Sequence, residues 1–527
     1  MPLTLQKNKM IDQEIQSLLA RYNIVYLNTV KYFFESPVNQ LYQQLLTVKR
    51  EAYDSNQRIV LVDTLLPDKR KQYFFNYFQK IITHLDITNC FVLVITADKD
   101  VVEYLNSARS AYSQDQTHVQ IEKLTTTAHE IIGSTNFAIP DSICINPWTN
   151  LEIDLAGQIT PCCLYKRSLT SKSIHDYSLL SIINDATQIQ LKQQFLQGQR
   201  PVGCQKCWDD EDHGKVSKRL QDNYVFREKL FNIDYNNVES TELVSLDIKL
   251  KNTCNLSCRI CNPVASSKWM SELSQHPESY PQWQSLRHIK LDWTDNTDSN
   301  LWKDLDKIGN HLQYITFTGG EPLLDKSHVR MLEYFVNNNR SSKISLHYNT
   351  NGTVYAKHLI PLWDEFKQVE LSFSIDNIES KFEYERYGST WTIVKNNIDQ
   401  YKKLNSKIYK LNVYCTVTAL NILDSYTVFQ FCADNKLPLA MNILDYPEEL
   451  NIGLFNHKQK NYISKKLLAI YNEEFHTIIK PIVRSMNSRT IQCNTTSMVN
   501  YLEITDKIRH QDFKKTYTEL ANILSWE

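Results

Sequence analysis

LKNTCNLSCRICNP, residues 250–263, places three cysteines on one short stretch: Cys254, Cys258 and Cys261. The preceding segment, LVSLDIKL (243–250), alternates apolar and polar residues, as expected of a strand with one buried face. Three thiolates on one loop can hold three irons of a 4Fe–4S cubane and leave the fourth iron open to a ligand. Three cysteines with a distant histidine can also bind zinc, so both kinds of site stay open at this point.

From residue 243 onward the sequence alternates strand-like and helix-like segments. After LVSLDIKL, the strand-like segments are HIKLDW, YITFTG, KISLHYNT, VELSFSID, LNVYCTVT and LAMNIL. Amphipathic stretches separate most of them, which is typical of βα units that build a parallel sheet covered by helices. We therefore predict an α/β fold with a partial (βα)6, TIM-like barrel over residues 240–446, followed by a helical C-terminal region at 447–527.

Two further domains are predicted upstream of this barrel. RIVLVDTLL from Arg58 and CFVLVITA from Cys90 alternate with helix-like stretches, which predicts a small α/β domain over residues 1–135. That domain contains neither a GxGxxG nor a GxxxxGK[ST] loop, so we assign it no nucleotide. A Thr-rich linker near residues 125–134 then leads to a cysteine-containing module at 141–225.

Composition argues against several classes of protein. The chain has 58 Lys+Arg against 59 Asp+Glu, so no long-range field would gather nucleic acid or an anionic membrane. Its longest apolar runs are far shorter than the roughly 18 residues of a membrane-spanning helix, and its N-terminus is polar rather than a secretory signal. Twelve cysteines in such a chain favour a reducing compartment, where thiols stay free for metals. We expect a cytoplasmic protein with no nucleic-acid partner and no membrane association.

The CxxxCxxC pattern after the first predicted barrel strand resembles the signature of the radical S-adenosylmethionine (SAM) superfamily. The resemblance implies that Cys254, Cys258 and Cys261 hold a 4Fe–4S cluster whose open iron is chelated by the methionine part of SAM. It also implies that the reduced cluster cleaves SAM to a 5'-deoxyadenosyl radical, which abstracts hydrogen from a substrate. The family usually has an aromatic residue before the third cysteine, where this chain has Ile260.

Later strand ends match the same family in order. FTGGEPLL from Phe317 resembles its GGEP motif, HYNTNGT its TNG segment, and SFSID the strand that reaches the SAM ribose. Because successive strand ends of a barrel meet at one face, such an ordered series points to a single site. The resemblance implies SAM contacts from Gly319, Gly320, Glu321, Asn349, Asn351, Ser374, Asp376 and Arg386. It adds Thr416, Asn421 and Leu444 as residues that line the pocket.

A second cysteine group lies upstream, in CINPWTNLEIDLAGQITPCC and GCQKCWDDE. Its first part resembles the Cx(9–15)Gx4C pattern of the auxiliary-cluster domains called SPASM and, in shortened form, twitch. Four cysteines can close the shell of a second, auxiliary 4Fe–4S cluster, and a structural zinc site is the alternative. Most relatives carry this module after the barrel, whereas this chain carries it before. The predicted ligands are Cys144, Cys162, Cys204 and Cys207, with Cys163 as an alternative to Cys162.

The sequence thus predicts a radical SAM enzyme with SAM and two 4Fe–4S clusters, the auxiliary one assisting electron transfer. The expected substrate is a peptide or protein, or a small molecule, and family analogy favours modification of a peptide side chain. Electrons would come from an external one-electron reductant that resembles flavodoxin or ferredoxin. Two alternatives stay open: a zinc-binding protein without catalysis on a degenerate barrel, and SAM-dependent methyl transfer by polar chemistry.

Overall fold

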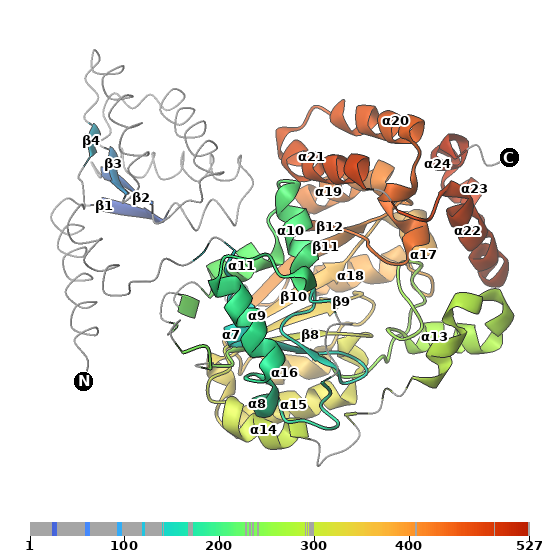
Figure 1. Ribbon diagram of the computed structural model, residues 1–527. Helices are drawn as coiled ribbons and strands as arrows, with labels where there is room; N and C mark the ends of the chain where they lie inside the picture. Colours follow the sequence, from blue (N-terminus) through green and yellow to red (C-terminus); the bar gives the residue numbers. More distant parts are fainter. Residues whose placement is uncertain are drawn as a thin grey trace, which may run out of the picture. The chain divides into compact units, whose positions relative to one another are not determined.

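The computed structural model describes residues 140–524 apart from short gaps, together with four strands nearer the N-terminus (Figure 1). The gaps are 141, 167–171, 227–228, 231–232, 234–236, 240–241, 290, 292, 295–299, 406–407 and 490. The chain divides into two compact units, Met1–Ile143 and Cys144–Glu527.

The first unit contains a parallel sheet with the strand order β1-β2-β3-β4. The strands are β1 (Ile24–Asn28), β2 (Arg58–Asp63), β3 (Val92–Thr96) and β4 (Val119–Ile121). The two strands predicted from Arg58 and Cys90 are therefore confirmed as β2 and β3. The helices expected between them and the linker near 125–134 lie outside the described residues.

An eight-stranded sheet forms the centre of the second unit, in the order β12-β11-β10-β9-β8-β7-β5-β6. All neighbouring strands run parallel except β5 and β6. The strands are β5 (Asn150–Ile153), β6 (Ile159–Thr160), β7 (Ser245–Lys249), β8 (Tyr314–Thr318), β9 (Ser345–Thr350), β10 (Gln368–Ser374), β11 (Tyr409–Val417) and β12 (Leu439–Ile443). The six strands β7 to β12 lie side by side in sequence order, as predicted for a partial (βα)6 barrel.

Helices connect the successive barrel strands, which confirms the α/β fold class. The α-helices of this part are α13 (Ser267–Gln275), α14 (Asn300–Ile308), α15 (Lys326–Asn337), α16 (Ile360–Trp363), α17 (Glu379–Glu385), α18 (Trp391–Tyr401) and α19 (Ser425–Asp434). Short 3-10 turns accompany them: η3 (Pro277–Ser279), η4 (Pro281–His288), η5 (Pro322–Leu324), η6 (Ser341–Lys343), η7 (Lys357–Leu359) and η8 (Ile422–Asp424).

The segment HIKLDW was predicted as a strand, but the sheet has no strand between β7 and β8. It starts at the last residue of η4, and two of its residues fall in the gaps. Because β7 pairs directly with β8, no strand fits between them. Of the apolar residues that suggested a strand, Trp293 packs into the hydrophobic core, whereas Ile289 is exposed.

The two faces of the barrel sheet differ in chemistry. Alternate residues on one face are apolar and join the buried core: Leu246, Ile248, Ile315, Phe317, Leu346, Tyr348 and Leu371. Side chains alternate between faces along a strand, and the opposite positions are polar. Glu152 lies opposite Asp247, and Asp247 lies opposite Thr316. His347 lies opposite both Thr316 and Glu370. Since the apolar face packs against the core, we assign this polar row to the inner side of the partial barrel.

The upstream cysteine module extends the barrel sheet instead of standing apart from it. Strand β5 pairs in parallel with β7, so that Leu151 lies opposite Leu246, and β6 folds back on β5. The other elements of the module are α7 (Asn146–Thr149), α8 (Leu179–Ile182), α9 (Ala186–Leu196), η2 (Val202–Cys204), α10 (Gln205–Asp212) and α11 (Lys218–Val225). In Figure 1 these helices, in green, lie beside the barrel strands.

The C-terminal region is helical, as predicted. It contains η9 (Glu448–Leu450), η10 (Ile452–Leu454), α20 (His457–Leu468), α21 (Glu473–Ser488), α22 (Thr495–Arg509), α23 (Phe513–Thr516) and α24 (Thr518–Ile523). Asn456 and Gln459 form a capping box that fixes the start of α20. His510 ends α22 in the left-handed conformation, which turns the chain back toward the barrel.

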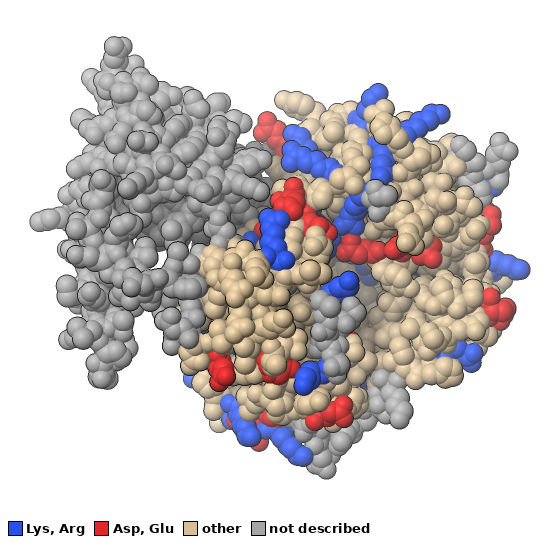
Figure 2. All heavy atoms as spheres, in the orientation of Figure 1, with Lys and Arg blue, Asp and Glu red and all other residues tan. Residues whose placement is uncertain are grey.

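Charged side chains of both signs occur across the visible face of the second unit, in agreement with a formal net charge of −1 (Figure 2). Among the described residues, none of the helices combines the length and the apolar character of a membrane span.

Candidate functional site

The three cysteines after β7 lie on a loop that is anchored at both ends. Cys258 is buried, while Cys254 and Cys261 are half-buried. The backbone N–H of Cys261 donates to the carbonyl of Cys258 at 3.0 Å, which closes a tight turn. At the other end, the Ser267 hydroxyl donates to the Cys254 carbonyl at 3.1 Å and accepts from the Cys254 N–H at 3.0 Å. The protein's own hydrogen bonds therefore define the shape of the loop.

The two glycines after β8 lie directly against this loop. The N–H of Glu321, the next residue, donates to the Thr253 carbonyl at 2.7 Å. A Cβ atom on Gly320 would lie 2.4 Å from the Thr253 oxygen and 2.6 Å from the carbonyl carbon of Asn252. Gly319 has a φ of +111°, a conformation that L residues rarely adopt. Close backbone approach therefore explains why the sequence has glycine at both positions.

Glu321 links the ends of β8 and β9. Its buried carboxylate accepts hydrogen bonds from the Thr350 hydroxyl at 2.8 Å, the Asn351 N–H at 2.7 Å and the Leu323 N–H at 3.2 Å. Burial raises the pKa of this carboxyl to about 7, and the three donors oppose that shift. The resemblance assigned Glu321 to the SAM amino group. The geometry gives it a structural role in addition, because both oxygens already have protein donors.

Two side chains direct N–H groups at the sulfur atoms of the loop. Asn351 Nδ2 lies 3.9 Å from Cys254 Sγ, and Arg386 Nη1 lies 4.0 Å from Cys258 Sγ. Burial raises the pKa of the Cys258 thiol to about 12 and that of Cys261 to about 11. A buried thiolate is unfavourable unless a cation neutralises it, so these sulfurs suit a bound metal group better than free thiolates.

Asp376 and Arg386 form a buried ion pair, with Asp376 Oδ2 at 2.6 Å from Arg386 Nη2. The other oxygen of Asp376 accepts the N–H of Thr416 at 2.8 Å. The resemblance placed Asp376 at the SAM ribose and Arg386 at the SAM carboxylate. In the structure they bind one another, and the pair orients Arg386 toward Cys258. The structure brings both residues to the cysteine loop.

The remaining sequence-predicted residues lie on the same strand ends. Ser374, half-buried, ends β10, and Asn349 on β9 has a buried Oδ1 without a hydrogen-bond partner among the described residues. Asn421 braces the turn after β11, donating to the Thr416 carbonyl at 2.9 Å. Leu444 is buried just after β12. Asn349 thus has a buried acceptor that a ligand could use.

The four cysteines predicted for an auxiliary site also come together. Cys144, Cys162 and Cys207 are buried, and Cys204 is half-buried. Burial raises the pKa of the Cys144 thiol, and the nearby Cys204 and Cys207 raise it further. Burial likewise raises the pKa of the Cys162 thiol, and the charges of Cys163, Cys144 and Cys207 add to that rise. The Lys166 N–H donates to the Gly203 carbonyl at 2.9 Å, so the two halves of the module meet next to Cys204.

Cys163 points elsewhere, although it follows Cys162 directly. Burial raises the pKa of the Cys163 thiol to about 12, and the next largest cause is the charge of Asp247 on β7. Lys218 on α11 acts on it in the opposite direction. The Cys163 side chain also forms a hydrogen bond with Asp247, which opposes the rise that burial causes in the pKa of that carboxyl. Cys163 therefore faces the polar row of the barrel, and Cys162 faces the cysteine group.

No three His, Cys, Asp or Glu side chains in the described part of the chain converge closely enough to hold a single metal ion.

Comparison with known families agrees with this geometry. Residues 248–423 match the model of the radical SAM superfamily. The chain carries a radical SAM domain. Residues 144–208 match the iron–sulfur cluster-binding domain SPASM, which ends one residue after Cys207. The predicted radical SAM domain and its auxiliary module are confirmed. The two domains imply SAM with a 4Fe–4S cluster in the first and an auxiliary iron–sulfur cluster in the second.

Solved structures with similar folds include anSMEcpe with bound AdoMet, which is 20% identical, with a TM-score of 0.27. The match covers 38% of this chain and 51% of that chain. SuiB of Streptococcus suis, bound to the precursor peptide SuiA, is 15% identical with a TM-score of 0.26, and the match covers 47% and 53%. The chain thus spans about half the length of these proteins. No curated protein matches the chain.

Sequence reasoning missed two sets of residues near the radical SAM site. The polar row of the inner sheet face could have been found, because the same alternation seen at Asp247 recurs at His347 and Glu370. The second set surrounds Arg259, which lies between Cys258 and Cys261, and involves Asp506 from the C-terminal region. No local sequence pattern predicts the ion pair of Arg259 with Asp506, because the two residues are 247 positions apart.

Proposed function

We propose that the chain is a radical SAM enzyme that uses Cys254, Cys258 and Cys261 as ligands of its SAM-binding cluster. The observation that carries this proposal is the convergence of separate strand ends on one loop. Backbone from the GGE segment touches the loop at Thr253, and Asn351 approaches the Cys254 sulfur. When bound, the cluster and SAM supply a 5'-deoxyadenosyl radical that abstracts hydrogen from substrate.

The chain's own residues bind and orient the reacting groups. Arg386 donates toward Cys258 and is held there by Asp376. The acceptor of Asn349 and the half-buried hydroxyl of Ser374 are available to SAM at the ends of β9 and β10. Gly319 and Gly320 let backbone approach the same place, and Glu321 fixes their orientation. The site is therefore largely preorganised before any cofactor binds.

We further propose that the substrate presents a polar group, as a peptide or protein side chain or as a polar small molecule. Support comes from the inner face of the sheet, where Asp247, His347 and Glu370 follow one another across the strands. An apolar substrate placed over these groups would remove water from them without replacing its hydrogen bonds, which is unfavourable. Family analogy favours a peptide side chain.

The auxiliary cluster would be held by Cys144, Cys162, Cys204 and Cys207 and would pass electrons rather than bind substrate, because four cysteine ligands leave no iron open. The module shares a sheet with the barrel through β5 and β7, which supports a fixed separation between the two cysteine groups. An external one-electron reductant, resembling flavodoxin or ferredoxin, would supply the first electron.

Anaerobic purification followed by iron and sulfide analysis tests the proposal directly. We expect about eight irons per chain, as two cubanes require, and no zinc. Addition of dithionite and SAM should then give 5'-deoxyadenosine, measured by mass spectrometry. Stoichiometric zinc without sulfide would instead support a zinc-binding protein. Iron without 5'-deoxyadenosine, accompanied by S-adenosylhomocysteine, would support polar methyl transfer.

The neighbouring Cys162 and Cys163 provide a matched pair of variants. Replacing Cys162 with Ala is expected to lower the iron content by about four per chain, because one ligand of the auxiliary cubane is lost. Replacing Cys163 with Ala should leave the iron content unchanged, because that thiol faces Asp247. Iron analysis of the two variants, with the first cluster monitored through 5'-deoxyadenosine formation, checks the assignment. The opposite pattern would identify Cys163 as the ligand.

A further inference from the structure

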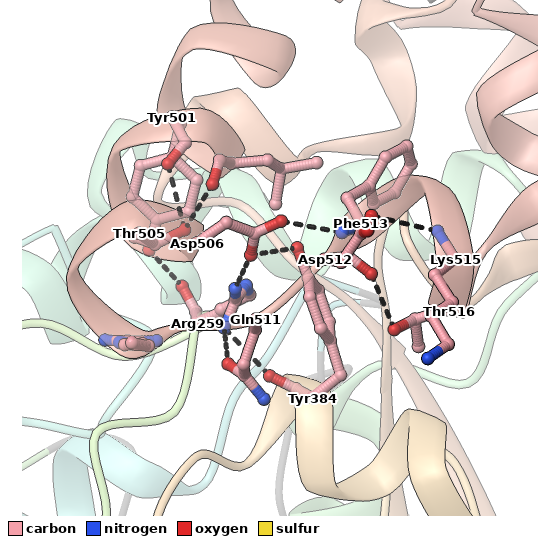
Figure 3. Close-up of polar contacts among 12 residues, drawn as sticks. Arg259, Tyr384, Tyr501, Thr505, Asp506, Gln511, Asp512, Phe513, Lys515 and Thr516 are labelled. Carbon is pink, nitrogen blue, oxygen red and sulfur yellow. Dashed lines mark hydrogen bonds and ion pairs between the residues drawn. The ribbon is translucent and has the colours of Figure 1, made fainter.

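Arg259 lies between two of the proposed cluster ligands, yet its side chain turns away from them into the protein. The residue is fully buried. Its guanidinium forms an ion pair with Asp506 of α22 and donates to Gln511 Oε1 and to the Tyr384 carbonyl, both at 2.9 Å (Figure 3). The same guanidinium lies over the Tyr384 ring, 3.7 Å from its centroid. A planar cation with five donors suits such a set of partners.

The peptide groups of Arg259 are held as firmly as its side chain. Its N–H donates to the Glu385 carbonyl at 2.8 Å. Its carbonyl accepts the hydroxyl of Tyr501, also at 2.8 Å. Cys258 precedes Arg259 directly, so these bonds fix the backbone that carries that cysteine. The loop thus has a second set of restraints, opposite the GGE segment.

Asp506 is the centre of these contacts. One oxygen accepts from Arg259 and from the Tyr384 hydroxyl, the latter at 2.8 Å. The other accepts the N–H of Phe513 at 2.6 Å, across the turn that follows α22 (Figure 3). The buried Tyr384 therefore has a structural role, because its hydroxyl holds Asp506 in place.

Helix α22 reaches the loop a second time through Arg509. Tyr501 and Arg509 are eight residues apart, so they lie on one face of the helix. Arg509 pairs with Glu272, with Nη2 at 3.1 Å from Oε1, and lies 4.7 Å from the Trp269 ring centroid. Trp269 Nε1 in turn donates to the Cys258 carbonyl at 2.8 Å. This helix therefore restrains the backbone at two successive carbonyl groups, directly at that of Arg259 and through Trp269 at that of Cys258.

We propose that Tyr501, Asp506 and Arg509 of α22 form a C-terminal clamp that positions Cys258 and Cys261 for cluster binding. These are positioning residues, since none of them touches a cysteine sulfur. This inference rests on the proposed function only in taking an iron–sulfur cluster as the group that the loop binds. The clamp itself follows from the contacts of Arg259 and the Cys258 carbonyl, and it makes the C-terminal helices part of the cluster site.

The clamp is tested first on cluster-free, full-length protein, by the rate at which iodoacetamide alkylates individual cysteines. Asp506→Asn removes the charge that pairs with Arg259 at almost unchanged shape. Tyr501→Phe removes only the hydroxyl that donates to the Arg259 carbonyl. We expect both variants to raise the alkylation rate of Cys258 relative to that of Cys432, a buried cysteine on α19 outside both cysteine groups. Peptide mass spectrometry gives the ratio.

Asp512→Asn is the matched control. Asp512 lies six residues from Asp506 and caps α23 without contacting Arg259, and asparagine caps a helix equally well. In this variant the ratio of the alkylation rate of Cys258 to that of Cys432 should equal the wild-type ratio. If Asp506→Asn and Tyr501→Phe leave the ratio unchanged, or raise both rates together through general destabilisation, the clamp is overturned.

A chelator challenge of the reconstituted protein tests whether the clamp also affects retention of the loop cluster. The clamp variants should lose the loop cluster about 10- to 100-fold faster than Asp512→Asn, the range typical of outer-shell partners, while the auxiliary cluster is lost at an unchanged rate. Equal loss rates in all variants would contradict the proposed effect on the cluster. A wild-type protein that takes up no iron at the loop, with the alkylation ratio still changed in the variants, would contradict the proposed function and leave the clamp standing.

Discussion

The Cys258→Ala variant is expected to form no detectable 5'-deoxyadenosine from SAM and dithionite. Its iron content should fall from about eight to about four per chain, because two cysteines cannot hold the loop cubane while the auxiliary one keeps its four ligands. The effect should exceed the roughly 100-fold upper range for outer-shell residues, since Cys258 is itself a proposed ligand. Iron analysis and mass spectrometry of the anaerobic protein measure both quantities.

Cys493→Ala is the control for this variant. Cys493 is half-buried and lies outside both cysteine groups, so its removal should change neither iron content nor product. Circular dichroism shows whether the two variants fold alike. Formation of 5'-deoxyadenosine by Cys258→Ala at a rate near that of wild type would contradict the assignment of the loop.

The second large effect is expected from Gly320→Ala. The added methyl group would meet backbone atoms of Thr253 and Asn252 at 2.4–2.8 Å, and a backbone cannot move aside as a flexible side chain does. Overpacking of this kind costs about 1–3 kcal/mol. Part of that cost will displace the cysteine loop, so we expect cluster affinity to fall by about 10- to 100-fold. Iron retention during a chelator titration measures it.

Gly198→Ala separates this steric effect from general destabilisation. Gly198 has a φ of +73°, and a Cβ atom added there would meet nothing within 4 Å, so alanine causes backbone strain without a clash. Strain of this kind costs about 1–2 kcal/mol, which is similar to the cost at Gly320. Both variants should melt at lower temperature, and only Gly320→Ala should lose loop iron more easily. Equal iron retention in the two would mean that Gly320 has no particular relation to the loop.

Most of the site could be predicted because it lies at the ends of parallel strands. In a parallel sheet, the residue that follows one strand lies next to the residue that follows the adjacent strand. The GGE segment, the TNG segment and Asp376 could therefore be placed together from the sequence. Local backbone requirements made the two glycines predictable as well. Gly320 lies too close to the cysteine loop for a Cβ atom, and Gly319 has a positive φ. Periodicity and turn chemistry are local properties, and a sequence displays them directly.

Other features depended on contacts that no local pattern encodes. The position of Cys163 next to Asp247 of β7 could not be predicted, because Cys162 and Cys163 are chemically identical in the sequence. The family pattern suggested a separate SAM contact for Asp376 and for Arg386, and it did not predict the ion pair that joins them. Asp506 meets Arg259 only because α22 packs back onto the barrel. Long-range packing decided each of these cases.

The pairing of β5 with β7 has a consequence for the sheet as a whole. Without the module, β7 would be a bare edge, with unpaired backbone groups next to the loop that carries the cysteines. Such an edge is a template for pairing with another chain and hence for aggregation. Strand β5 covers it, and the new edge strand, β6, has only two residues. Very short edge strands are one means by which proteins avoid such association, so the module also protects the barrel from its own copies.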